Sequence, residues 1–355
     1  MKPLAVILPL ILLSLLLAIY TGLLRIGVGM PGSLAIAHHG SLMVNCFLAS
    51  VIFLERAVSF KSKWLLLLPF VNALSLIAFV LNHPDVAFML TLLGSFGFMV
   101  MCGWFIYKYK EPYYYVFFVG AFCLLTGNSL LLKSNFYPAS VVFWMLFLLF
   151  TIVAERLELT RFLPVSKKAH ISLYAILTLM IIAAFLPFHS YGSSLLALSF
   201  LLCAAWLLKY DMAKKAMKMQ GHHRYSGLLL IAGYFWLMIT AGILLIWQNI
   251  PFGYDAMLHS FFIGFVFSMI FSHAPIILPA VIKKPIRIYR PILYYWFVLL
   301  QLSLVMRIIA DIYGFYQLRK LSGLVNGISL LIFFITIAAT AVVEWKKISR
   351  RSIKS

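Results

Sequence analysis

Twelve long apolar stretches constrain this chain more than any other feature of its sequence. A helix needs roughly 20 apolar residues to cross the hydrocarbon core of a bilayer. We place the stretches at residues 4–24, 34–55, 63–82, 86–107, 113–132, 138–156, 170–188, 191–209, 227–247, 256–277, 291–311 and 322–344. They occupy most of the 355 residues, which leaves no soluble domain of useful size. The sequence predicts an all-α, polytopic membrane bundle of about 12 transmembrane helices, with residues 1–355 forming a single domain.

Positive charge divides the connections between these stretches into two classes. Of the 29 Lys and Arg residues, 24 lie in alternate connections or beside the termini, beginning with Lys2, Arg56, Lys61 and Lys63. The exceptions are Arg25, Lys133, Arg307, Arg319 and Lys320. Because basic connections stay in the cytoplasm, both termini are predicted to be cytoplasmic.

Composition excludes several classes of function. The chain is 64% hydrophobic and 11% charged, which is typical of a multi-pass membrane protein. Its net charge of +20 is spread over short connections and therefore favours anionic lipid over nucleic acid as a partner. The first stretch is too long for a signal peptide and is predicted to be retained. No nucleophile, base and acid share one depth, so a soluble type of hydrolase is not expected.

The longest connection is basic and also contains methionine and histidine side chains, which can bind soft metal ions. It carries Met212, Met217, Met219, His222 and His223 among its lysines. One interpretation is a site for a soft metal. The other, which we favour, is a basic segment at the membrane interface whose methionines contact lipid.

Histidines inside two stretches are the strongest candidate functional residues. His38 and His39 lie about one turn inside the second stretch, and His259 lies at a similar depth in the tenth. Both stretches enter from the outer side under the predicted topology. His259 and one of the pair are therefore expected to meet across a helix interface, as a bis-histidine haem b requires; the same pair would also suit copper. The alternative is an ordinary hydrogen bond between helices.

Other side chains extend this candidate site. His39, Met43 and Cys46 are spaced i, i+4 and i+7, which places imidazole, thioether and thiol on one face of an α-helix. Copper prefers this set of ligands. His273 follows His259 on nearly the same face, but about 21 Å along the helix axis. His273 is therefore predicted to serve a second centre or a structural role.

Arg307 and Asp311 form an i, i+4 pair near the outer end of the eleventh stretch. At that level Arg307 would neutralise a haem propionate. The alternative is an ordinary ion pair at the membrane interface.

Three segments together resemble the NnrS family. They are HHGSLMVNCFLASVIFLERAV from His38, AERLELTRFLP from Ala154 and LHSFFIGFVFSMIFSHAPIILPAV from Leu258. The resemblance implies a bacterial inner-membrane protein with twelve helices that contains haem and copper and is linked to nitric oxide. In the tenth stretch, the residues that resemble the family's motif are His259, Gly264, Met269 and His273. In the second stretch, His38, His39 and Met43 resemble the His-rich start of the family's other motif. The chain has fewer Trp and His residues around the second motif than the family usually shows.

The chain also has a distant likeness to the catalytic subunit of haem-copper oxidases, which places haem ligands on its second and tenth helices. The sixth stretch here contains no histidine and the seventh contains no His pair. Terminal oxidase or nitric oxide reductase activity is therefore not expected.

These observations support one leading hypothesis and two alternatives. The leading hypothesis is an inner-membrane protein that binds haem b and/or copper, linked to nitric oxide stress or metal handling, with nitric oxide or a related small molecule as ligand. His39 and His259 are its principal ligands, with His38 and His273 as alternates. The first alternative is a transporter of small solutes or metals without a redox centre. The second is a structural subunit of a membrane complex.

Overall fold

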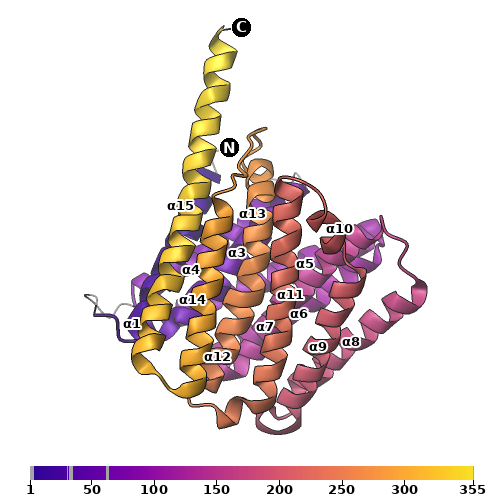
Figure 1. Cartoon of the computed structure of the whole chain (residues 1–355), viewed down its shortest axis with the longest axis vertical. Helices are drawn as coiled ribbons and strands as arrows, with labels where there is room; N and C mark the ends of the chain where they lie inside the picture. The colour runs from indigo at the N-terminus through magenta and orange to yellow at the C-terminus, as the bar shows by residue number, and fades with distance from the viewer. Residues whose placement is uncertain (1–3, 30, 32–34, 61–63, 355) are drawn as a thin grey trace. The chain divides into compact units, whose positions relative to one another are not determined.

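The computed structural model describes residues 4–29, 31, 35–60 and 64–354, and their side chains except those of residues 5 and 349–354 (Figure 1). The described residues form helices joined by short connections, and no β-strand occurs among them. Lys2, Lys61 and Lys63, which belong to the basic connections, lie outside the described residues.

Eleven helices in the described part of the chain are long and apolar enough to cross a membrane. This confirms the prediction of a helical bundle and indicates a multi-pass membrane protein. The third predicted stretch forms a shorter helix, α4 (Leu67–Val80, 14 residues), after the 3-10 turn η3 (Trp64–Leu66). The 3-10 turn takes up the start of the predicted stretch, and α4 is followed by Asn82 in a left-handed conformation (φ 58°) and by Pro84, which begins the next helix.

The chain divides into two compact units, Met1–Glu155 and Arg156–Ser355. A division by contacts does not show that each unit folds alone, so the single domain remains a prediction. Besides η3 and α4, the first unit contains α1 (Leu4–Arg25), η1 (Ile36–His38), α2 (His39–Ser41), η2 (Leu42–Ala49), α3 (Ser50–Ser59), α5 (Pro84–Tyr109), α6 (Pro112–Ser134) and α7 (Tyr137–Thr160), whose last turn belongs to the second unit.

Buried amides join the helices of the first unit. The Nδ2 atom of Asn72 donates to the Asn45 carbonyl oxygen at 2.6 Å and to Ser50 Oγ at 2.9 Å. Asn128 Nδ2 donates to the Thr91 carbonyl oxygen at 3.2 Å, and Asn128 Oδ1 accepts from Trp144 at 2.9 Å. These bonds satisfy polar groups that would otherwise be costly in an apolar interior.

The second unit contains the last six long helices. They and their connections are α8 (Lys167–Phe185), η4 (Phe188–Gly192), α9 (Ser193–Tyr210), α10 (Ala213–Met217), α11 (His222–Ile246), η5 (Trp247–Asn249), α12 (Gly253–His259), η6 (Ser260–Val266), α13 (Phe267–Val281), α14 (Leu293–Tyr313) and α15 (Tyr316–Lys354). Within this unit α14 packs along α15, and α11 packs against both α9 and α13 (Figure 1).

Each of the two units contains a π-helical segment that closely follows a candidate histidine. In the first unit η2 follows the three-residue helix α2, which begins at His39. In the second unit η6 follows α12, which ends at His259. π-Helical segments are rare and are frequently found at functional sites.

Candidate functional site

His39 packs against α1 and has a defined tautomer. Its Nδ1 atom lies 2.8 Å from the Ala18 carbonyl oxygen. A carbonyl oxygen can only accept a hydrogen bond, so we assign the proton to Nδ1 and the lone pair to Nε2. An imidazole held in this way through Nδ1 is arranged to bind a metal through Nε2.

A glycine on α1 allows this close packing of His39. A Cβ atom at Gly22 would lie 2.8 Å from Cε1 of His39 and 3.2 Å from its Nδ1. Cβ atoms essentially never approach another heavy atom to less than 3.0 Å. The backbone of α1 therefore forms one wall of the space that holds the imidazole.

The substitution Gly22→Ala tests this role. We expect it to displace the imidazole of His39 and to lower the free energy of unfolding by about 1–3 kcal/mol, the usual cost of overpacking. Chemical denaturation in detergent measures the change. Gly103→Ala is the matched control, because a Cβ at Gly103 would meet only Phe118 at an ordinary 3.6 Å. An equal loss of stability in both variants would contradict the proposed close packing.

The π-helical segment separates the side chains that an α-helix would align. Bonds from residue i to residue i+5 give more than four residues per turn, so position i+7 rotates away from the face of His39, whereas position i+4 stays near it. Cys46 is fully buried, and its Sγ atom lies 3.0 Å from Ser75 Oγ on α4, whereas His39 bonds to α1. The structure thus directs His39 and Cys46 toward different helices. Met43 is half-buried in the same segment.

His38 faces a different part of the first unit. Its Nδ1 atom lies 2.9 Å from the hydroxyl oxygen of Tyr137, and its ring stacks on Phe79 with centroids 4.9 Å apart. The hydroxyl can donate or accept, so this contact does not define the tautomer. His38 is held by aromatic rings, which makes it less suited than His39 to a fixed ligand role.

His259 in the second unit has the same tautomer as His39. Its Nδ1 atom lies 2.9 Å from the Asp255 carbonyl oxygen and 3.4 Å from the carboxylate Oδ1 of the same residue. Both oxygens are acceptors, so Nδ1 carries the proton and Nε2 the lone pair. No hydrogen-bond partner for Nε2 is found among the residues that the structure describes. The side chain remains 23% exposed, so the ring is not sealed inside the unit.

Two arginines and two aspartates form a closed ionic cluster beside His259. Asp255 Oδ2 accepts hydrogen bonds from Arg307 Nη2 and, at 2.9 Å, from Arg319 Nη2. Asp311 accepts from Arg307 Nε at 3.3 Å and from Arg319 Nε at 2.9 Å. The formal charges cancel within this cluster, which joins α12, α14 and α15.

Arg307 is more extensively bound than the predicted ion pair with Asp311. Its side chain is only 2% exposed, and its Nη1 atom also donates to the Arg319 carbonyl oxygen at 3.3 Å. Each of its three nitrogens therefore donates to a protein oxygen. Because two carboxylates already balance its charge and that of Arg319, the arrangement does not favour an additional propionate at Arg307.

His273 is engaged at both ring nitrogens. Its Nδ1 atom lies 2.7 Å from the Met269 carbonyl oxygen, so Nε2 is the acceptor for Arg156 Nη2 at 2.8 Å. Arg156 is itself buried, with 5% exposure. The lone pair of His273 is thus occupied by a protein donor, which favours the structural role over ligation of a second centre.

Sequence reasoning missed two members of these networks. Arg319 stands out in the sequence only as an exception to the charge pattern, and Arg156 is one of the basic residues that follow that pattern. One sequence feature could have predicted the ionic cluster: its four charged residues lie near ends of three stretches that are predicted to be on the same side. They are Asp255, Arg307, Asp311 and Arg319. Opposite charges at one depth of a membrane bundle are expected to pair.

The described residues contain no group of three or more His, Cys, Asp and Glu side chains that could hold a metal ion.

Over residues 4–342 the chain matches the family model described as a domain of unknown function, DUF8744. The chain belongs to the DUF8744 family. No curated protein and no solved structure matches the chain.

Proposed function

We propose that this DUF8744 protein binds a haem b and/or copper in the bacterial inner membrane, in the manner of the NnrS family. The supporting observation is that His39 and His259 each present Nε2 as the lone-pair atom beside a π-helical segment. Imidazole nitrogen is a ligand for both haem iron and copper. Both termini would be cytoplasmic, as the charge pattern indicates, with the shorter helix α4 crossing the membrane as the twelfth helix.

The chain's own residues have separate parts in this proposal. His39 and His259 would ligate, and the Ala18 and Asp255 carbonyls would hold their rings in the required tautomer. The ionic cluster would fix the start of α12, which carries His259. A haem held by both histidines would supply electron transfer, whereas copper held by the same two imidazoles would also offer a binding place for nitric oxide or a related small molecule. The protein would act in protection from nitric oxide or in metal handling.

Spectroscopy of the purified protein tests the proposal. We expect a Soret band that changes between the oxidised and reduced states, or bound copper by metal analysis, after expression with ample haem and copper. His39→Ala and His259→Ala should each remove or shift this signal, because each deletes a proposed ligand. His83→Ala is the matched control, since His83 is exposed at the start of α5.

Two results would contradict the proposal. One is a protein with neither a Soret band nor copper. The other is a full signal in both the His39→Ala and the His259→Ala variants. If solute uptake into proteoliposomes accompanied either result, the transporter hypothesis would replace the present one.

A further inference from the structure

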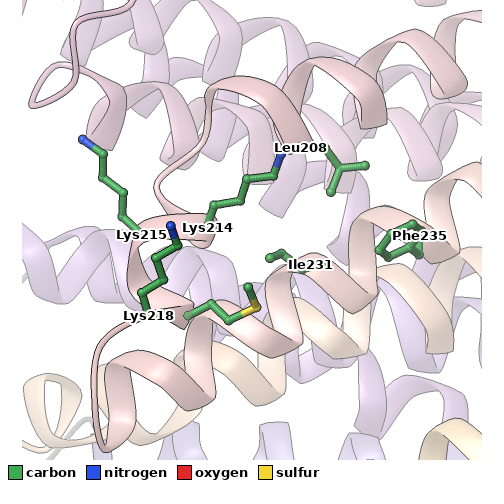
Figure 2. A pocket seen from close by; sticks show the side chains of 7 residues that line it. Leu208, Lys214, Lys215, Lys218, Ile231 and Phe235 are labelled. Atoms are coloured by element: carbon green, nitrogen blue, oxygen red, sulfur yellow. The ribbon is translucent and has the colours of Figure 1, made fainter.

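A basic cavity lies in the second unit where α9 ends, α10 follows and α11 begins. Its volume is about 460 Å³. Lys214, Lys215 and Lys218 line one part of it, and Leu208, Ile231 and Phe235 line another (Figure 2). The cavity thus combines cationic and apolar walls, which is the chemistry of an amphipathic anion.

The short helix that carries these lysines is held firmly against α11. Asp211 Oδ2 accepts from the Ala213 backbone nitrogen at 2.9 Å and from the Tyr234 hydroxyl at 3.0 Å. A Cβ at Gly227 would lie 2.7 Å from the Ala213 carbonyl oxygen, so the two backbones are in close contact. These contacts hold the backbone that carries the lysines in one place beside α11.

The lysine charges are not neutralised by the protein. Lys214, Lys215 and Lys218 are exposed, and in the described part of the chain none of them forms an ion pair. The nearest acidic side chain in sequence, Asp211, is buried with 6% exposure and bonds to Ala213 and Tyr234 instead. The site therefore carries an uncompensated charge that attracts an anion.

The apolar wall continues along α11 and accounts for the rest of the ligand. Ile231 and Phe235 are spaced i, i+4, so they lie on one face of the helix. Phe235 is 54% exposed. Figure 2 shows the Lys214 side chain extending toward Leu208, with Ile231 and Phe235 following one another along the neighbouring helix. A free inorganic anion would make no use of this wall, whereas an acyl chain would cover it.

We infer that this cavity is a binding site for an anionic phospholipid. Lys214 and Lys218 bind the headgroup phosphate, Lys215 adds charge at the rim, and the first part of an acyl chain lies against Leu208, Ile231 and Phe235. Basic pockets between membrane helices are a recognised site for anionic headgroups. The site would tie this end of α9 and α11 to the leaflet that carries anionic lipid.

Native mass spectrometry of the full-length protein, titrated with defined lipids in detergent, tests the inference. We expect the first dioleoyl phosphatidylglycerol to bind at least tenfold more tightly than dioleoyl phosphatidylcholine. The double variant Lys214→Gln/Lys218→Gln should weaken phosphatidylglycerol binding by roughly 25-fold, at about fivefold for each lysine near an anionic headgroup. The Lys214→Arg/Lys218→Arg variant should retain binding within about threefold.

Two further variants distinguish lipid binding at this cavity from nonspecific attraction of an anionic lipid to the positive charge of the protein. Lys167→Gln/Lys168→Gln removes the same charge from exposed lysines at the start of α8 and should change the affinity by less than twofold. Phe235→Ala should weaken the binding of dioleoyl phosphatidylglycerol, because it removes part of the apolar wall against which the acyl chain lies. Equal losses in both double Gln variants would overturn the inference. Displacement of the lipid by millimolar inorganic phosphate would also overturn it, as would equal affinity for phosphatidylcholine.

Discussion

Replacing Arg307 with methionine is expected to lower the free energy of unfolding by about 3–5 kcal/mol, the usual cost of removing one partner from a buried ion pair. Arg307 is 2% exposed and Asp311 is fully buried. Without Arg307, Asp311 keeps only Arg319, and Asp255 loses one of its two arginines. A buried carboxylate with too little positive charge beside it destabilises the folded state.

Unfolding in detergent, followed by circular dichroism, measures this loss. Lys320→Met is the matched control, because it removes one positive charge next to Arg319 from a residue without an ion pair in the described part of the chain. We expect a change of less than about 0.5 kcal/mol there. The double variant Arg307→Met/Asp311→Asn should cost clearly less than the sum of its single variants. Strict additivity would show that the two side chains do not stabilise one another.

The second large effect is expected for Gly253→Ala, at the first residue of α12. A Cβ atom there would collide with the carbonyl oxygen of Trp247 and lie 2.7 Å from its carbonyl carbon. Backbone atoms cannot rotate away as the end of a side chain can, so the start of α12 must move. We expect a loss of about 3 kcal/mol, the upper end for overpacking. Because α12 carries Asp255 and His259, the haem or copper signal that we propose for this protein should also shift.

Gly242→Ala is the control for this variant. Gly242 lies inside α11, and nothing lies within 4 Å of a Cβ built on it. Alanine should therefore stabilise the helix by about 0.5–1 kcal/mol, because it restricts the unfolded backbone more than glycine does. The two glycine variants thus have opposite expected signs, and thermal unfolding of both in one detergent gives a direct comparison. A loss of stability at both positions would contradict the argument that the room for a Cβ atom decides the effect of alanine.

The helices were predictable because membrane length and apolar composition are local properties of sequence. The eleven long helices follow from such stretches. The third stretch gives a shorter α-helix than predicted, because Trp64–Leu66 at its start form the 3-10 turn η3 and the helix ends at Val80, shortly before left-handed Asn82. Backbone conformation at a helix end depends on a few neighbouring residues, and hydropathy alone does not report it.

The sequence singles out His39 and His259 as candidate ligands, but it could not predict their contacts. Their similar depth in the membrane stays a prediction from their positions in apolar stretches. Their tautomers depend on the Ala18 and Asp255 carbonyls, one on another helix and one a turn earlier. The spacing of His39, Met43 and Cys46 assumed a regular α-helix, and the π-helical segment η2 changes the faces that they occupy.

The sequence alone determined that this is a chain of apolar helices with positive charge concentrated in alternate connections, because both properties are set by composition along short segments. Only the tertiary structure decided what the buried charges do. Arg307 and Arg319, two exceptions to the charge pattern, are neutralised by Asp255 and Asp311. His273 is occupied by Arg156. Pairing in an apolar interior depends on which groups meet across helices, and that is a property of packing, not of position along the chain.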